Sequence, residues 1–311
     1  MKKVINDIVN ELDKIISFSE DKINGINIEK NNFKKINQGK LKKKICFVDG
    51  GNQEIIGSSN FSLQFIRVYY NISLDKKIGS RKYEFFILIN SVNENNNIKY
   101  KTKIFGGFKE LELVFDSFDN TLTGIKRAKI SEIGNVIRRF AEIKSASLID
   151  IKDSVIILDG DLEANLTYEH IFLDELFRKA REKNNILLGL SKTTDLFTDN
   201  ANSIAAVLNK IGEGSWYYKI NDSIYFVKLN KDSRYVFRLD FFDFNEDIFS
   251  LLSNNAKDPV FIGYPYGLID AHKFAKISND EKEYLRLKII SNLKINEYLS
   301  AVNAHNILDS I

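Results

Sequence analysis

The hydrophobic pattern of this chain changes its period near residue 131, and this change limits the folds that it can adopt. Before it, three runs rich in β-branched and aromatic residues follow one another, at 45–48, 63–72 and 83–89. After it, residues 131–148 repeat apolar side chains at helical spacing. A continuous apolar run at 155–158 is then typical of a strand buried on both faces. Consecutive strands favour an antiparallel meander, whereas a helix between two strands allows them to be parallel.

The rest of the chain continues to alternate helices and strands. The spacing predicts helices near 1–17, 169–182, 200–210 and 270–277, and strands at 186–190, 223–227 and 234–242. This is the order of an α/β, ribonuclease-H-like mixed sheet, in which three antiparallel strands are extended by parallel strands joined through helices. We therefore expect a helical, basic N-terminal extension over 1–44, a domain with flanking helices over 45–311, and a helical C-terminal extension.

Composition and cysteine content exclude several classes of protein. Hydrophobic residues make up 44% of the 311 residues and charged residues 28%, which is typical of a globular chain and not of a disordered one. The single cysteine, Cys46, excludes a disulfide framework and a cysteine zinc site, and its apolar neighbours predict a buried thiol. We find neither a signal peptide nor 18 consecutive apolar residues, so we expect a cytoplasmic protein without a membrane span.

The charge of the chain is small but unevenly distributed. The net charge is +3, while the first 45 residues carry eleven lysines and only six acidic residues. A basic end on a nearly neutral protein permits a polyanionic partner but does not require one. A lysine-rich solvated surface would give the same count.

Two aspartates stand where predicted strands end. Asp49 follows the run 45–48 and Asp159 follows the run 155–158, and each is followed by glycine. Strand ends in an open α/β sheet face a common crevice, so the two carboxylates can converge there. Converging carboxylates repel each other unless a cation lies between them, and oxygen ligands without thiols favour Mg²⁺ or Mn²⁺. The alternative is that each Asp-Gly pair forms a turn and nothing more.

Glu142 lies on the predicted helix between these two strands. On a helical wheel it falls opposite Ile133, Ile137 and Phe140, and this periodicity favours a solvated surface glutamate. A functional role would require the polar side of the helix to face the crevice.

The segment 263–272 is the most distinctive in the chain, because it combines aromatic residues, one of two prolines and one of three histidines. Tyr264 could stack on a base or donate a hydrogen bond to a phosphate, and His272 could bind a metal or transfer a proton. A packed turn followed by a capped helix is the alternative. Lys192, after the strand predicted at 186–190, could contact a phosphate or simply be exposed.

Together these motifs resemble those of the NurA family of nucleases. The resemblance rests on Phe-Val-Asp-Gly-Gly at 47–51, Glu142, Ile-Leu-Asp-Gly at 157–160, Gly-Leu-Ser-Lys at 189–192 and the block 264–272. The motifs keep the family's order and extend over most of the chain. Each Asp-Gly motif is weak alone, whereas the block 264–272 is specific.

The resemblance implies a ribonuclease-H-like fold and a manganese-dependent deoxyribonuclease, acting as a 5′-to-3′ exonuclease and a single-strand endonuclease. It implies a homodimer that works with a hexameric HerA-type ATPase in DNA end resection. Matched to the family's motifs, Asp49, Glu142 and Asp159 are metal ligands, and Tyr264 and His272 belong to the last motif. We expect His272 to complete the metal shell or move a proton, Tyr264 to position the DNA strand, and Lys192 to neutralise phosphate charge.

Three other interpretations remain open on the sequence. The chain could be an inactive relative that binds DNA and an ATPase as an adaptor. It could be a phosphotransferase of the actin-like and sugar-kinase group, although that class needs a second glycine-rich phosphate loop and Asp159-Gly160-Asp161 is a poor candidate for one. It could also be an α/β domain without a site.

Overall fold

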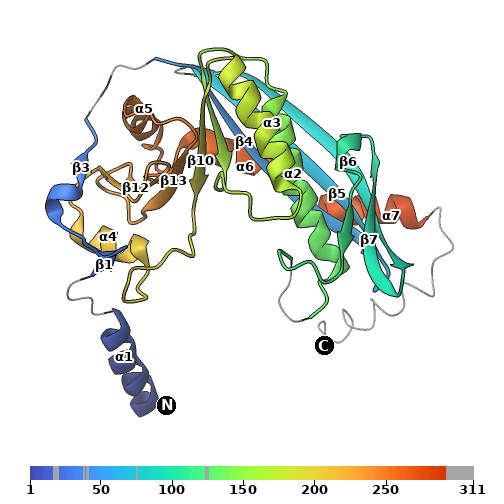
Figure 1. Cartoon of the computed structure of the whole chain (residues 1–311), viewed down its shortest axis with the longest axis horizontal. Coiled ribbons are helices and arrows are strands. Elements are labelled where there is room, and N and C mark those ends of the chain that lie inside the picture. The colour runs from blue at the N-terminus through green and yellow to red at the C-terminus, as the bar shows by residue number, and fades with distance from the viewer. Residues whose placement is uncertain (17–20, 38, 40–41, 75, 123–125, 292–311) are drawn as a thin grey trace. The chain divides into compact units, whose positions relative to one another are not determined.

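The structure is a computed structural model that describes residues 1–16, 21–37, 39, 42–74, 76–122 and 126–291. The chain forms two compact units (Figure 1). The larger unit contains the long strands and the helices around them, and the smaller unit contains the N-terminal segment and most of residues 186–266.

The larger unit is built on strands in the spatial order β9, β4, β5, β6, β7, β8. Their bounds are β4 (Ile45–Gly57), β5 (Phe61–Leu74), β6 (Lys76–Glu94), β7 (Asn97–Phe105), β8 (Val114–Asp116) and β9 (Val155–Asp159). Strands β4 to β8 pair antiparallel, and β9 pairs parallel to β4, with Val48 opposite Leu158. The predicted sequence of three antiparallel strands followed by a parallel strand is therefore confirmed, and the ribonuclease-H-like class stays a prediction.

Helices cover both faces of β4. The helices of this unit are α2 (Ile133–Ser147), α3 (Glu169–Glu182), α6 (Tyr266–Ala275) and α7 (Asn279–Ile290), with short 3₁₀ turns at Lys109–Leu111 and Ile130–Glu132. Alternate residues of a strand point to opposite faces. Accordingly, the amide of Asn52 donates to Asn135 on α2, whereas Gly51 faces the end of α6 at Ala275. Helices α2 and α3 pack side by side through Phe140 and Phe172 (Figure 1).

The parallel strand β9 is buried on both faces, as its apolar run predicts. Val155, Ile157 and Leu158 are fully buried, and Cys46 of β4 lies opposite Ile156. Cys46 is fully buried, which confirms the predicted core thiol, and burial raises the pKa of this thiol.

The smaller unit contains a second set of strands in the order β3, β11, β12, β13, β10, and neighbouring strands pair antiparallel. Its elements are α1 (Lys2–Ile16), β1 (Lys22–Ile23), β2 (Ile26–Asn27), a 3₁₀ turn at Lys30–Asn32, β3 (Lys34–Lys35), β10 (Ile186–Ser191), α4 (Ile204–Ile211), β11 (Trp216–Lys219), β12 (Ile224–Lys228), β13 (Phe237–Phe241) and α5 (Asp247–Asn255).

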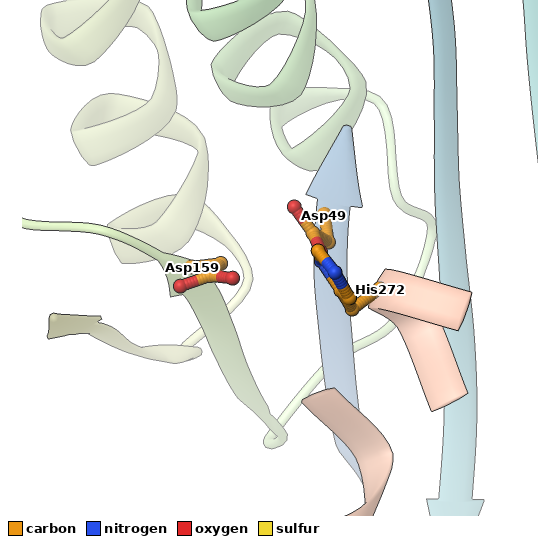
Figure 2. Close-up of side chains that lie close together, drawn as sticks. All are labelled: Asp49, Asp159 and His272. Carbon is orange, nitrogen blue, oxygen red and sulfur yellow. The ribbon is translucent and has the colours of Figure 1, made fainter. Parts of the chain in front are cut away.

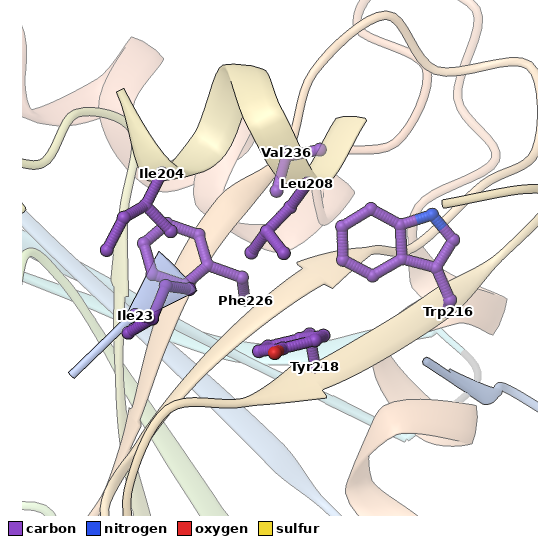
Figure 3. Packing of buried hydrophobic residues seen from close by; sticks show 7 residues of the cluster. All are labelled: Ile23, Ile204, Leu208, Trp216, Tyr218, Phe226 and Val236. Atoms are coloured by element: carbon purple, nitrogen blue, oxygen red, sulfur yellow. The ribbon is translucent and has the colours of Figure 1, made fainter. Parts of the chain in front are cut away.

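The core of the smaller unit draws on the N-terminal segment. Ile23 packs with Leu208 of α4 and with Trp216, Tyr218 and Phe226 of β11 and β12 (Figure 3). The segment before residue 44 thus contributes to a hydrophobic core, and the predicted domain boundary at residue 44 stays a prediction.

Several elements differ from the sequence-based prediction. Strands β7, β8 and β11 and helix α5 were not predicted, and helix α6 begins at Tyr266, four residues before its predicted start. The predicted helical C-terminal end lies in part outside the described residues, beyond 291. None of the helices in the described part of the chain has the length and hydropathy that a bilayer crossing requires.

Candidate metal centre

Asp49 is held in a fixed orientation on strand β4. Its side chain is only 5% exposed. One carboxylate oxygen, Oδ1, accepts a hydrogen bond from the backbone N–H of Gly50 at 2.7 Å. The other, Oδ2, lies 2.9 Å from Nδ1 of His272 on α6, whose own side chain is 61% exposed. A buried carboxylate and an accessible imidazole therefore meet at the surface of the larger unit.

Two glycines allow α6 to approach β4 closely enough for this contact. A Cβ at Gly267 would lie 2.0 Å from the Phe47 ring, and a Cβ at Gly51 would lie 2.5 Å from the carbonyl oxygen of Ala275. Real side chains cannot occupy such positions, so only glycine permits this packing. The close packing of α6 thus explains Gly51, which lies within β4 and not in the predicted turn.

Asp159 is the last residue of β9 and marks the point where the chain passes into the smaller unit. Its Oδ2 accepts an ion-paired hydrogen bond from Lys192 Nζ, and its Oδ1 lies 3.4 Å from the hydroxyl of Tyr264. Lys192 Nζ also lies 5.3 Å from the centre of the Tyr264 ring, which is a cation–π distance. Lys192 and Tyr264, both predicted site residues, are therefore neighbours of Asp159.

The parallel ladder between β4 and β9 ends at Val48 and Leu158, so Asp49 and Asp159 follow it at corresponding positions. The prediction that the first strand ends at Asp49 is wrong, because β4 keeps pairing with β5 as far as Gly57, and only Asp159 stands at a strand end. Asp49, Asp159 and His272 each offer one ligand atom, and these atoms lie within 4.8 Å of one another. Figure 2 shows Asp49 on its strand, Asp159 at the end of the next strand, and His272 reaching toward Asp49 from α6. Two carboxylates and one imidazole are a donor set that could hold a divalent cation such as Mn²⁺ or Mg²⁺. The Lys192 ammonium is the positive charge that lies beside Asp159 in this structure.

Glu142 is not part of this group of three ligand atoms. It is buried, and its carboxylate is ion-paired with Arg138 one helical turn earlier on α2. A Cβ on Gly50 would lie 2.5 Å from Glu142 Oε1, so the carboxylate packs directly against the backbone next to Asp49. The helical-wheel interpretation of Glu142 as a solvated surface residue is therefore wrong, because Gly50 leaves room for its carboxylate against the strand.

Two positioning residues escaped the sequence analysis. Arg138 donates to Glu142 and, at 3.4 Å, to the carbonyl of Gly50. Asn71 of β5, buried inside the larger unit, donates from its amide to the Gly267 carbonyl at 2.8 Å and to Asp270 at 2.9 Å. The i,i+4 spacing of Arg138 and Glu142 was visible in the sequence, whereas nothing local marks Asn71.

A buried ion pair fixes the segment that follows Asp159. Arg238 and Asp240 alternate on β13 and form two hydrogen bonds, and Asp240 also accepts from the backbone N–H of Leu162 at 3.1 Å. Burial raises the pKa of Asp240, and the Arg238 guanidinium partly opposes this shift. Because Leu162 is three residues after Asp159, this pair restrains the exit of the chain from the site.

The sequence matches no protein-family model and shows no significant similarity to a curated protein sequence. Among solved structures, the chain is similar to the NurA nuclease from Sulfolobus solfataricus, with a TM-score of 0.52, 14% identity, and coverage of 94% of this chain and 93% of that one. The chain therefore has a NurA-like fold.

Two other solved structures are similar to the chain at lower TM-scores. Endonuclease V from Ciona intestinalis, in complex with DNA, covers 88% of this chain and 96% of its own, with 10% identity and a TM-score of 0.37. The Argonaute of A. aeolicus covers 76% of this chain and 28% of its own, with 13% identity and a TM-score of 0.33.

Proposed function

We propose that this protein is a metal-dependent deoxyribonuclease that hydrolyses phosphodiester bonds. The observation that carries the proposal is the convergence of Asp49, Asp159 and His272 within 4.8 Å, just beyond the parallel ladder of β4 and β9 in a NurA-like fold. Lys192 and Tyr264 beside Asp159 add a positive charge and a hydroxyl donor, as the binding of a phosphate requires.

Asp49, Asp159 and His272 would hold the cation, and Glu142 is the fourth candidate ligand. A divalent ion bound there supplies an activated water and stabilises negative charge on the scissile phosphate. Manganese, which the sequence motifs imply, and magnesium both fit this donor set.

The side chains themselves have separate tasks in this proposal. The Gly50 N–H holds the Asp49 carboxylate in one orientation. The carboxylate would therefore not have to rotate in order to bind the cation. Asp159 would exchange its Lys192 partner for the cation, and this exchange would release the ammonium to pair with a phosphate oxygen. The exposed imidazole of His272 can exchange protons with solvent.

The finer parts of the proposal come from the resemblance of the motifs. We propose 5′-to-3′ exonuclease and single-strand endonuclease activity in DNA end resection, a homodimeric assembly, and a hexameric HerA-type ATPase as partner. We also propose a ribonuclease-H-like sheet and a cytoplasmic location for the protein.

Cleavage of end-labelled single- and double-stranded DNA tests the proposal. We expect degradation with Mn²⁺ or Mg²⁺ and none with EDTA. Asp49→Asn should reduce the rate at least about 100-fold, because loss of a metal ligand costs no less than loss of a group that orients one. Asp150→Asn, at a side chain that is 91% exposed, is the matched control and should cleave like the wild type.

A folded protein that binds DNA but cleaves it with neither metal, even with its ATPase partner added, would contradict the proposal and favour the adaptor interpretation. Metal-dependent cleavage that survives in Asp49→Asn would show that the site lies elsewhere.

A further inference from the structure

A chain of aromatic rings in the smaller unit leads from solvent to Asp159. The ring of Tyr235 lies 5.2 Å from that of Phe261, centre to centre, in an edge-to-face arrangement. Phe261 in turn stacks on Tyr264 at 5.1 Å, with 20° between the ring planes. The hydroxyl of Tyr264 is the group that reaches Asp159. The rings therefore form a continuous path that ends at a predicted ligand of the metal.

The outer end of this path exposes apolar surface. Tyr235 is 55% exposed, and the neighbouring loop leaves Val260 78% and Ile262 38% exposed, whereas Tyr264 at the inner end is buried. Phe261, between the two tyrosines, is half-buried. Contiguous exposed apolar side chains are typical of a binding surface, whereas singly scattered ones are not.

Hydrogen bonds and close packing hold the backbone under the rings in one turn. The Ser233 hydroxyl accepts from the N–H of Tyr235 at 3.0 Å and donates to its carbonyl at 3.1 Å. Gly263 adopts a φ of +92°, and a Cβ there would lie 2.3 Å from the same hydroxyl, so the loop carrying Phe261 is locked onto this turn. A surface that is already ordered loses little conformational entropy when it binds a ligand.

The charges beside the rings identify the occupant. Lys192 Nζ lies 5.3 Å from the centre of the Tyr264 ring, and the exposed Arg234 precedes Tyr235. Flat aromatic rings next to cations are the combination that binds an unstacked nucleic-acid base together with its phosphate. An apolar protein segment would gain nothing from the cations, and a phosphate alone would gain nothing from the rings.

We propose that the exposed ring of Tyr235, supported edge-to-face by Phe261, stacks on the base of a nucleotide that flanks a phosphate bound beside Lys192 and Asp159. Tyr235 and Phe261 are called the platform below. This inference rests on the proposed nuclease function and adds the residues that recognise the substrate beside the cut. A base on this platform must have left its own stack, so a duplex end has to open by at least that nucleotide before it can enter.

Binding of a single-stranded oligodeoxynucleotide that carries 2-aminopurine at successive positions tests the platform. The Asp49→Asn background prevents cleavage, and the emission of 2-aminopurine reports stacking directly. We expect a change of emission confined to one or two positions. Phe261→Leu and Tyr235→Leu should each abolish that change and weaken binding by about five- to 150-fold.

Phe244→Leu is the matched control, because Phe244 is 49% exposed and stacks on Tyr225 in the same unit. It should leave both readouts unchanged, and thermal melting verifies that all three variants are folded. If the two platform variants bind and respond as Phe244→Leu does, the inference is wrong. If they change only the oligomeric state, the rings serve a protein interface and the inference is also wrong.

Cleavage by the wild type, measured separately, distinguishes this inference from the function on which it rests. Position-specific stacking lost in the variants, in a protein that never cleaves DNA, would support the platform and contradict the nuclease. Cleavage with unaltered stacking in the variants would support the nuclease and contradict the platform.

Discussion

Gly50 contacts three residues of the candidate site, Asp49, Arg138 and Glu142. Its N–H orients Asp49, its carbonyl accepts from Arg138, and its missing side chain makes room for Glu142. Its role therefore depends on what approaches it, and not on an unusual backbone angle.

We predict that Gly50→Ala displaces the Glu142 carboxylate and with it the orientation of Asp49. The free energy of unfolding should fall by about 1–3 kcal/mol, as for other overpacked positions, and the rate of DNA cleavage should fall with it. Gly79→Ala on β6 is the control, because a Cβ there meets nothing within 4 Å. Urea denaturation and the cleavage assay measure both effects, and equal behaviour of the two variants would refute the role of Gly50.

The position of a single residue in the structure could be predicted where the local sequence pattern determines it. Asp49 and Asp159 each follow an apolar β-run, so their convergence could be predicted. The continuation of β4 past Asp49 could not, because residues 49–54 are polar or glycine and show no strand pattern. The burial of Glu142 could not be predicted from periodicity, because it depends on a glycine of a distant strand. Asn71 was missed for the same reason, since its hydrogen-bond partners lie almost 200 residues away.

At the scale of elements, Asn71 fixes helix α6 and thereby His272. We predict that Asn71→Leu, of similar volume, leaves the Gly267 carbonyl and Asp270 without this donor and lowers the free energy of unfolding by about 1–3 kcal/mol. Affinity for Mn²⁺ should fall about 10- to 100-fold, as for other groups that orient a ligand.

Hydrogen exchange over 266–275 and Mn²⁺ titration measure these effects of Asn71→Leu. Asn90→Leu, on β6 opposite Lys101 of β7, is the control. Faster exchange with unchanged Mn²⁺ affinity would show that Asn71 stabilises the helix without serving the site.

Helix α7 is tied to the sheet by Arg67 of β5. The guanidinium binds Glu84 at 2.7 Å and both carboxylate oxygens of Glu281. Burial alone would raise the pKa of Glu84, but hydrogen bonds from Lys82 and Arg67 outweigh it and hold the pKa below its ordinary value of 4.5.

A carboxyl group whose pKa is lowered in the folded state stabilises the fold at pH values above its ordinary pKa. This stabilisation is lost as the pH falls through the folded-state pKa. We therefore predict that protection of 279–290 from hydrogen exchange is constant near neutral pH and declines only below pH 4.5. Glu84→Gln should weaken this dependence. An identical pH profile in the variant would assign the acid sensitivity to other carboxyls.

The order of the first strands and helices could be predicted because their apolar runs are bounded by polar residues or repeat at helical spacing. Strand β7 was missed although Lys99, Lys101 and Lys103 alternate with buried residues, which is an ordinary strand signal. Strand β11 has four residues, too few to establish a period, and it is ordered by pairing with β12.

Metal binding at the candidate site should raise the free energy of unfolding of the whole protein. A cation bound only by the folded state, at 100 times its dissociation constant, stabilises that state by about 2.7 kcal/mol. We predict that Mn²⁺ raises the melting temperature of the wild type by several degrees and leaves that of Asp49→Asn almost unchanged. An equal shift in both proteins would mean that Mn²⁺ binds elsewhere.

We propose that one divalent cation is held jointly by Asp49, Asp159 and His272. Anomalous diffraction at the manganese edge, from crystals grown with Mn²⁺ at a concentration that supports cleavage, tests it most directly. We predict an anomalous peak about 2.0–2.3 Å from an oxygen of each aspartate and from a ring nitrogen of His272. A peak elsewhere, with the Asp49–His272 hydrogen bond intact, would show that these three residues do not hold the cation.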